Sequence, residues 1–331
     1  MMALLRHAPD GSCPGDAAPV VVLAGGVGAA RFLEGVVQVV APDQVIAIVN
    51  VGDDLEVGGL HVSPDLDTVT YTLAGRVNPE TGWGLRSDTF QALEALEELG
   101  GPGWFRLGDR DIATHIYRTQ RMREGLTLSA VTAEITCALG VGVRVLPVTD
   151  QRMRTMVETP EGEISFQEYF VRRRTQDRVL GLRFDGAAEA SAAPGVHEAI
   201  MGARAIVIAP SNPFLSIEPV LAVPGVRDCL LASEAPKAAV SPIIGGAVVK
   251  GPAAAILESL GHDVSALGVS RLYGDLVDLF VLDEVDAGMA DSVRAEVGVE
   301  CLVTPTLMSG APEKLALAAA TLAALQALPA A

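Results

Sequence analysis

Cysteines and basic residues are scarce in this sequence, and no apolar run is long enough to cross a membrane. The four cysteines, at positions 13, 137, 229 and 301, form no CxxC pair and have no metal-ligand spacing. We therefore expect free thiols in a reducing compartment, and a cytoplasmic protein. The 24 Lys and Arg residues face 41 Asp and Glu residues, a net charge of −17. That balance argues against a nucleic-acid partner, because phosphate backbones bind clustered cations.

Neither end of the chain reads as a membrane or targeting segment. Residues 1–18 contain Pro, Gly and Asp without a long apolar core, so we predict a flexible tail rather than a signal peptide. Residues 315–328 are apolar and Ala-rich, but Glu313 and Lys314 precede them and the run is too short for a bilayer. We expect a buried C-terminal helix and no membrane partner.

Short apolar runs alternate with helical patterns along most of the chain. The runs are "VVVLA", "QVIAIVN", "RVLPVTD", "RAIVIAPSN" and "DLFVLDE", and helical patterns include residues 88–99 and 129–139. This alternation predicts a Rossmann-like α/β fold, with a mostly parallel sheet and helices on both of its faces.

The stretch "RMRTMVETPEGEISFQEYF" departs from this alternation. Two strand-like runs flank Pro160, Glu161 and Gly162, which predicts a hairpin. The segment that best fits a boundary between structural units is 184–195, which is rich in small residues. We therefore predict a single domain over residues 19–331, with a smaller inserted α/β subdomain at roughly residues 150–195.

A glycine-rich turn follows the first predicted strand. Gly25, Gly26 and Gly28 open a helix, where backbone N–H groups and the helix N-terminus favour a phosphate. Arg31 stands where a third glycine would complete a dinucleotide fingerprint, which weakens the case for a nicotinamide cofactor. A tight strand–helix turn without a ligand is the alternative.

The stretch "NVGDDLEVGGLHVSPDLDTVTY" brings several acids to the end of the second predicted strand. Ligands of open parallel sheets bind outside the carboxyl ends of the strands, so these acids and the glycine turn should share one edge. Acids repel a phosphate unless a cation lies between them, and Mg²⁺ prefers carboxylate and phosphate oxygens. The candidates are Asp53, Asp54, Asp65 and Asp67, although Asp65 and Asp67 also fit helix caps.

A third cluster lies in "FRLGDRDIATHIYRTQRMREG". Asp109 and Arg110 open a predicted helix, on which Asp111, His115 and Arg118 share one face. Such a face can bind phosphate or carboxylate, and we take Asp109, Arg110 and His115 as candidate substrate-binding residues. An internal ion-pair network is the alternative.

Two later loops fit a nucleotide. Ser211 and Asn212 end a predicted strand, and an Asn side chain offers both a donor and an acceptor to a base or ribose. Gly245 and Gly246 form another glycine turn, and Lys250 follows as a nearby cation. Two glycine turns, an acid cluster and a lysine suit a ligand that carries a diphosphate.

The order of these motifs resembles one family closely. "LAGGVGAARFL", "NVGDD", "SPDLDTVTY", "LGDRDIATHIYRT", "QEYFVR", "APSNPFLSI" and "VSPIIGGAVVKGP" are similar to the 2-phospho-L-lactate transferases (CofD or FbiA family) of coenzyme F420 biosynthesis. The resemblance runs from about Val20 to the C-terminal helix. It departs at Val51, where many members have Thr, and in the extended N-terminal tail.

The resemblance implies two substrates, a metal and an assembly. The acceptor would be the deazaflavin Fo, whose terminal ribityl hydroxyl attacks the phosphorus of a guanosine-diphosphate-linked three-carbon acid and displaces GMP. The metal would be Mg²⁺, and the protein a homodimer. The acid stays open between lactate, enolpyruvate and glycerate.

The resemblance also assigns roles to residues. The catalytic residues would be Asp53, Asp65 and Asp67. Asp53 and Asp65 would hold Mg²⁺, Asp54 and Asp67 would lie next to it or bind the acceptor, and one of these carboxylates would take the hydroxyl proton. Arg86, in "GWGLRSDTF", would lie near the Fo ring. The nucleotide would be held by Gly25, Gly26, Gly28, Ser211, Asn212, Gly245 and Gly246.

Two other functions remain as alternatives. A related group of CofD-like proteins resembles sugar-nucleotide-binding regulators and carries a Gly-Gly-Ser-Ser-Gly turn after its aspartates, which "GDDLEVGGLHVSPDLDTVTY" lacks. An NAD-dependent dehydrogenase is weakened by Arg31 and by Asn50, which stands where a ribose-binding acid would end the second strand.

Overall fold

The central feature of the protein is a seven-stranded sheet in the order β14-β13-β10-β9-β1-β2-β5. The computed structural model describes residues 18–248 and 251–328, so Cys13, Lys250 and nearly all of the predicted tail lie outside the described residues. The strands are β1 Val20–Ala24, β2 Val45–Val49, β5 Arg144–Pro147, β9 Ala205–Ile208, β10 Lys237–Val240, β13 Leu279–Leu282 and β14 Glu300–Val303. Each neighbouring pair is parallel, which confirms the predicted α/β class.

The inner strands form because their residues are β-branched or apolar and covered on both faces. Every residue of β1, β2, β9 and β13 is buried. Such continuous apolar runs are typical of parallel strands with helices on both sides. β10 and β14 are strands that the sequence patterns did not predict. β10 reads "KAAV" with two alanines, and the edge strand β14 reads "ECLV" with exposed ends, so neither shows a continuous apolar run.

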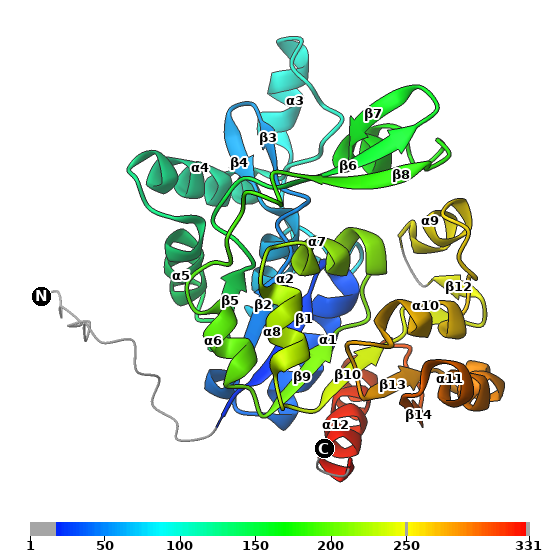
Figure 1. Ribbon diagram of the computed structural model, residues 1–331. Helices are drawn as coiled ribbons and strands as arrows, with labels where there is room; N and C mark the ends of the chain where they lie inside the picture. The colour runs from blue at the N-terminus through cyan, green and yellow to red at the C-terminus, as the bar shows by residue number, and fades with distance from the viewer. Residues whose placement is uncertain (1–17, 249–250, 329–331) are drawn as a thin grey trace, which may run out of the picture.

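The strand order reverses between β1 and β9. From β1 the chain proceeds through β2 to β5 on one side, and from β9 through β10 and β13 to β14 on the other. The loops that leave the two central strands therefore diverge and open a crevice, which is where doubly wound sheets bind ligands. Figure 1 shows helices such as α6 and α8 lying over this sheet.

Helices flank the sheet and complete the core. α1 (Gly26–Val39) packs against α2 (Pro64–Leu73) and against α12 (Ala311–Ala327), the predicted C-terminal helix. The other helices are α3 Gln91–Glu98, α4 Asp109–Arg123, α5 Leu128–Ala138, α6 Val196–Met201, α7 Glu218–Leu221, α8 Val226–Ala232, α9 Ala253–Ser259, α10 Ala266–Tyr273 and α11 Ala290–Val297. Short helical turns span Pro42–Gln44, Glu168–Arg172, Pro213–Ile217 and Glu284–Met289. Within the described residues, no helix is both long and apolar enough to cross a membrane.

A separate three-stranded antiparallel sheet contains β6 (Arg154–Thr159), β7 (Gly162–Ser165) and β8 (Gly181–Asp185). β6 and β7 form the predicted hairpin. Figure 1 shows this sheet at the same end of the molecule as α3 and the hairpin of β3 (Leu55–Val57) and β4 (Leu60–Val62). The segment after β7 contacts the loop that follows β2, because Gln167 Nε2 donates to the Asp53 carbonyl at 3.3 Å. The limits of the predicted subdomain stay a prediction.

Candidate active site

The glycine turn after β1 is a crowded meeting point of three chain segments. Gly26 has a φ of +71°, and its N–H donates to Asp65 Oδ1 at 2.9 Å. A Cβ at Gly25 would lie 2.8 Å from Asp65 Oδ2, and one at Gly28 would lie 2.1 Å from the Pro210 carbonyl oxygen. Glycine is therefore required here by close approach, and the turn does bring the first strand, the acids and the end of β9 together.

Asn50 joins the glycine turn to the acids. Its Nδ2 donates to Asp65 Oδ2 at 2.9 Å and to the Leu215 carbonyl at 3.2 Å, while its Oδ1 accepts from Gly52 N–H at 2.7 Å. Burial raises the pKa of Asp65 to about 6, although the hydrogen bonds from Asn50 and Gly26 act in the opposite direction. In the sequence, Asn50 pointed only to the absence of a ribose-binding acid. The signal for its real role was a buried polar residue at a strand end.

Asp53 and Asp54 each keep one buried oxygen without a hydrogen-bond partner among the described residues. Burial and the neighbouring Asp65 and Asp54 carboxylates raise the pKa of Asp53 well above its usual value. Burial also raises the pKa of Asp54, whose Oδ2 accepts from the Ser63 hydroxyl at 2.8 Å and lies 3.0 Å from His61 Nε2. Crowded, desolvated carboxylates with free oxygens favour a cation, because a cation removes both the repulsion and the unsatisfied acceptors.

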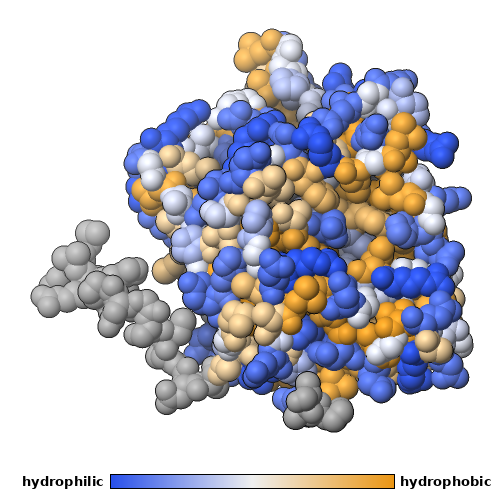
Figure 2. All heavy atoms as spheres, viewed as in Figure 1, coloured by the Kyte–Doolittle hydropathy of each residue, from blue (hydrophilic) through white to orange (hydrophobic). Residues whose placement is uncertain are grey.

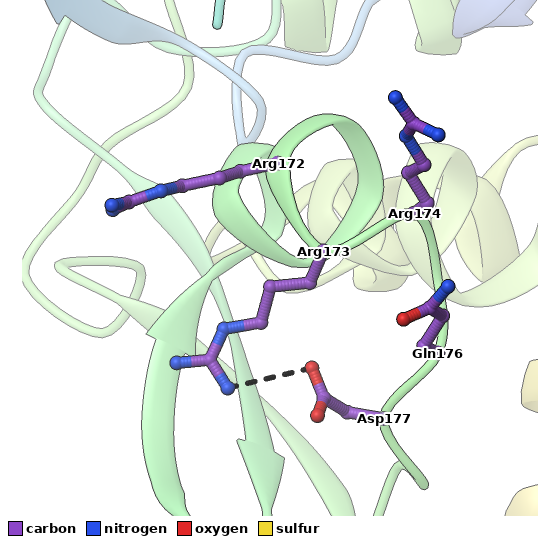
Figure 3. Close-up of a pocket in the computed structure, with 5 residues that line it drawn as sticks. All are labelled: Arg172, Arg173, Arg174, Gln176 and Asp177. Atoms are coloured by element: carbon purple, nitrogen blue, oxygen red, sulfur yellow. Dashed lines mark hydrogen bonds and ion pairs between the residues drawn. The ribbon is translucent and has the colours of Figure 1, made fainter.

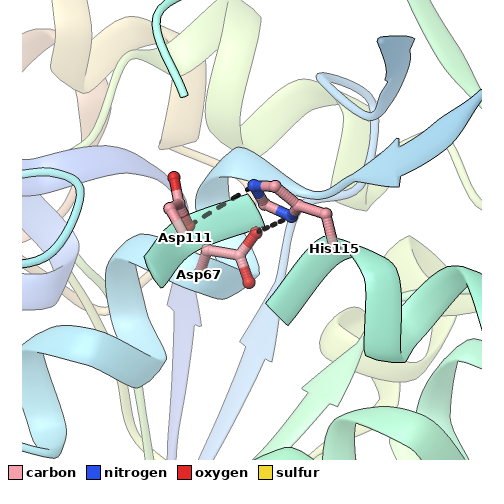
Figure 4. Close-up of side chains that lie close together, drawn as sticks. All are labelled: Asp67, Asp111 and His115. Atoms are coloured by element: carbon pink, nitrogen blue, oxygen red, sulfur yellow. Dashed lines mark ion pairs between the residues drawn. The ribbon is translucent and has the colours of Figure 1, made fainter. Parts of the chain in front are cut away.

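Asp67 belongs to a different network, which α2 shares with α4. Both of its oxygens bind the Arg118 guanidinium, Oδ2 at 3.1 Å from Nη1. His115 lies between two carboxylates, with Nδ1 3.7 Å from Asp67 and Nε2 3.3 Å from Asp111 (Figure 4). The Tyr71 hydroxyl donates to Asp111 at 2.7 Å. Burial acts to raise the pKa of Asp111, but His115, Tyr71 and Arg118 outweigh it and lower that pKa.

Asp67, Asp111 and His115 also bring one possible metal ligand each within 4.8 Å of one another. A guanidinium stays protonated in proteins, so Arg118 already supplies the cation that pairs with Asp67. The contacts therefore favour the ion-pair network over a metal at this cluster. The free oxygen of Asp53 makes the acids after β2 the better place for a divalent ion, and Mg²⁺ at Asp53 and Asp65 stays a prediction.

Ser211 and Asn212, in the loop after β9, lie at the predicted edge, but some of their polar atoms already bind the backbone. The Ser211 hydroxyl donates to the Gly25 carbonyl at 2.9 Å. Asn212 Oδ1 accepts from Phe214 N–H at 3.0 Å and Leu215 N–H at 3.2 Å, so its acceptor serves the backbone. Its buried Nδ2 has no partner in the described part of the chain. Asn212 therefore keeps only its donors for a ligand.

Asp109 and Arg86 make contacts that hold the fold. The Asp109 carboxylate accepts from Gln91 N–H at 3.1 Å, Ala92 N–H at 2.9 Å and the Thr89 hydroxyl at 2.5 Å, which caps α3. Arg86 Nη2 donates at 2.7 Å to a carbonyl just beyond the C-terminal end of α2. Asp65 is in the first turn of that ten-residue helix, about 15 Å away along its axis. Ligand roles for Asp109, Arg86 and Arg110, which follows Asp109 on α4, stay predictions without a supporting contact.

The second glycine turn is a two-residue hairpin turn. Gly245 and Gly246 have φ values of +59° and +78° and connect β11 (Ile243–Ile244) to β12 (Ala247–Val248). Gly245 N–H donates to Asp286 Oδ2 at 3.0 Å, so a carboxylate already uses one donor of the predicted phosphate cradle.

Two cavities lie near the small sheet. One of about 210 Å³ is bordered by Asp54, Leu55 and His61 together with Arg154. The other, of about 430 Å³, is lined by Arg172, Arg173, Arg174, Gln176 and Asp177. Figure 3 shows its three arginines pointing in different directions, with Arg173 directed at Asp177. The larger cavity therefore has no converging set of cations, and the smaller one borders Asp54.

The fold and this site define a class of protein. A doubly wound α/β sheet, with glycine, asparagine and aspartate residues gathered at its switch point, is typical of proteins that bind phosphorylated ligands there. The chain belongs to the family described as 2-phospho-L-lactate transferase CofD, which matches residues 20–301. This confirms the predicted family, and it supports an enzyme that catalyses a transfer of the phospholactate type.

Named relatives share most of their length with this chain. The phosphoenolpyruvate transferase of Streptomyces griseus is 47% identical, over 90% of this chain and 96% of that protein. The phosphoenolpyruvate transferase of Thermobifida fusca is 45% identical, over 90% and 94%. The 2-phospho-L-lactate transferase of Methanothermobacter thermautotrophicus is 40% identical, over 90% and 95%. A UPF0052-family protein from Bacillus halodurans, 18% identical, shares the fold with a TM-score of 0.57 over 88% of this chain and 94% of that one.

Proposed function

We propose that this protein transfers a phosphate-linked three-carbon acid from a guanosine-diphosphate-linked donor to the terminal ribityl hydroxyl of Fo, in coenzyme F420 biosynthesis. The acceptor oxygen forms a bond to the phosphorus next to the acid, the bond from that phosphorus to GMP breaks, and the hydroxyl proton leaves. Membership of the CofD family is the observation that carries this proposal. The crowded acids next to the glycine turn support it, because such a transfer needs charge neutralisation more than covalent chemistry.

Enolpyruvate is the acid that we propose first. Five relatives named phosphoenolpyruvate transferase are 43–47% identical to this chain. Three relatives named 2-phospho-L-lactate transferase are 37–40% identical. We therefore expect the enolpyruvyl donor to give a higher kcat/KM than the lactyl or glyceryl donor.

We propose that Asp53 and Asp65 hold Mg²⁺ in this reaction. The free buried oxygen of Asp53 and the raised pKa values of both acids fit a site built for a cation. Both Asp65 oxygens already accept one hydrogen bond, and each keeps a second lone pair for a metal. When bound, the ion would neutralise the diphosphate and stabilise the charge on the leaving GMP.

We assign the remaining roles in the reaction to side chains of the protein. Asp54 keeps one free oxygen and a raised pKa, so we assign it the proton of the acceptor hydroxyl. Asn212 Nδ2 would donate to the nucleotide. Asp67, which we also predicted to be catalytic, is paired with Arg118, and we assign it to support of α2 instead.

A turnover assay tests the proposed function. Purified protein is mixed with Fo and each guanosine-diphosphate-linked acid, with and without Mg²⁺, and both the charged deazaflavin product and GMP are followed. We expect equal amounts of both products, only with Mg²⁺, and most rapidly from the enolpyruvyl donor. No product from any donor, together with tight binding of a UDP-sugar, would support the regulatory alternative.

A further inference from the structure

One turn of α4 contacts both α2 and β4, the two elements next to the acids. Arg118 and Thr119 are adjacent in this helix and buried, 2% and 7% exposed. They contact different segments: Arg118 binds Asp67 on α2, and Thr119 Oγ1 accepts from His61 N–H on β4 at 2.7 Å. A single helical turn therefore touches both of the segments that flank the acids.

The first contact fixes α2. Asp67 and Asp65 lie in the first turn of the same helix, and Asp65 is the residue that meets Gly26 and Asn50. A bidentate guanidinium–carboxylate pair fixes orientation as well as distance, because two parallel hydrogen bonds define a plane. Rotation or sliding of α2 would break that pair and would move Asp65 away from the glycine turn.

The second contact fixes Asp54. Thr119 holds the backbone of His61, and the ring of His61 lies 3.0 Å from Asp54 Oδ2 through Nε2. Ser63, two residues later, donates to the same oxygen. Only the other oxygen of Asp54 stays free, so the position of β4 decides where that oxygen points.

We propose that Arg118 and Thr119 are positioning residues of the transferase, which set Asp65 and Asp54 relative to each other without touching either substrate. This inference rests on the proposed function. A buried ion pair is a poor source of stability, since desolvation offsets most of its attraction, so net stabilisation is a weak reason for Arg118. Orientation is the stronger reason, because Lys keeps the charge but lacks the planar fork.

The sharpest test compares Thr119→Val with Thr119→Ser. Val has nearly the same shape without the acceptor, and Ser keeps the hydroxyl. We expect Thr119→Val to lower kcat by about 10-fold with little change in the KM for Fo, because small misplacements of reacting groups slow the chemical step. It should also weaken the Mg²⁺-dependent binding of GDP, measured by calorimetry. Thr119→Ser should restore both quantities.

Arg118→Lys provides the second arm, with Arg121→Lys as its matched control. Arg121 lies on the same helix and pairs with Glu134 at 2.7 Å. It is partly exposed, and its ion pairs are with Glu134 and Glu124 rather than with an acid of the site. We expect Arg118→Lys to lower kcat by about 10-fold or more and Arg121→Lys to leave it unchanged.

The inference is overturned if Thr119→Val and Arg118→Lys lower only the melting temperature and keep wild-type kcat and GDP binding below it. That result would leave the proposed function intact. A wild-type protein that neither forms product nor binds GDP with Mg²⁺ would instead overturn the proposed function, and this inference with it.

Discussion

Asp53 is the least satisfied acid of the site. It is buried, its pKa is raised, and one of its oxygens has no hydrogen-bond partner among the described residues. A carboxylate in this state works against folding unless a cation or a proton neutralises it. Its presence therefore fits ligand binding better than stability.

Asp53→Asn should separate these two effects. We expect turnover to fall at least about 100-fold, because a charged ligand of the proposed Mg²⁺ is lost. The melting temperature should stay the same or rise, because Asn keeps the shape and removes the buried charge. Initial rates at saturating Mg²⁺ and thermal unfolding measure the two quantities.

Glu56→Gln is the control for that variant, since Glu56 is an exposed acid on β3, three residues after Asp53. It should leave turnover unchanged. Near-wild-type turnover in Asp53→Asn would remove Asp53 from the site.

Asp65 makes stability depend on pH. Its pKa is raised from 3.8 to about 6 in the folded protein. Between these values the unfolded chain loses the proton and the folded chain keeps it, so the free energy of unfolding falls as pH rises, by up to about 3 kcal/mol. Urea unfolding of the metal-free protein between pH 4.5 and 7.5 should show this fall. Asp65→Asn should make the fall smaller but not remove it, because the pKa values of Asp53 and Asp54 are raised as well. An unchanged slope would contradict the assignment.

Asp67 is a residue of the predicted site whose partner the sequence did not predict. Its position before Thr68, among the acids that follow the second strand, suggested a helix cap or a metal ligand, yet it pairs with Arg118, 51 residues further along the chain. Spacing did place Asp111, His115 and Arg118 on one helical face. It could not tell which element that face would meet.

At the scale of elements, Gly35 sets the contact of α1 with α12. A Cβ at this position would lie 2.0 Å from the Lys314 carbonyl oxygen. Lys314 Nζ also pairs with Glu34 at 2.5 Å, so the two helices meet closely at this point. Close backbone approach is the reason for a glycine inside a helix that would otherwise favour Ala.

Gly35→Ala should therefore destabilise the protein. In an open helix the change would stabilise by up to about 1 kcal/mol, but here the overlap should destabilise by about 1–3 kcal/mol. Thermal or urea unfolding measures this. Gly288→Ala is a suitable control, because a Cβ there meets nothing within 4 Å. A melting temperature that rises in Gly35→Ala would show that α12 does not pack as described.

At the scale of the whole molecule, charge is the main feature. A net charge of −17 opposes compaction and makes cations stabilise the protein in general. Figure 2 shows hydrophilic side chains over much of the viewed face and an apolar tip at the top of the view. Leu99, which directly follows α3, is 86% exposed. The predicted homodimer stays a prediction, and light scattering at several concentrations tests it.

Specific Mg²⁺ binding should exceed this general charge effect. We expect millimolar Mg²⁺ to raise the melting temperature more than NaCl of equal ionic strength. At ten times the dissociation constant, binding adds about 1.4 kcal/mol to the free energy of unfolding. The excess should disappear in Asp53→Asn and persist in Glu56→Gln. Equal effects of both salts on the wild type would contradict a specific site.

The sequence was sufficient to predict most of the inner strands of the sheet and the edge at which the site lies. β-branched runs such as "VVVLA" and "VIAIV" are typical of buried strands, and parallel strands bring their carboxyl ends to one edge. The glycine turn and the acids therefore had to meet. Tertiary packing determined the individual contacts of the site. Arg118 became the partner of Asp67, and Asn50 the partner of Asp65. The backbone became the partner of Asn212 Oδ1. Most of these contacts join residues that are far apart in the chain. They become close and buried only when the protein folds.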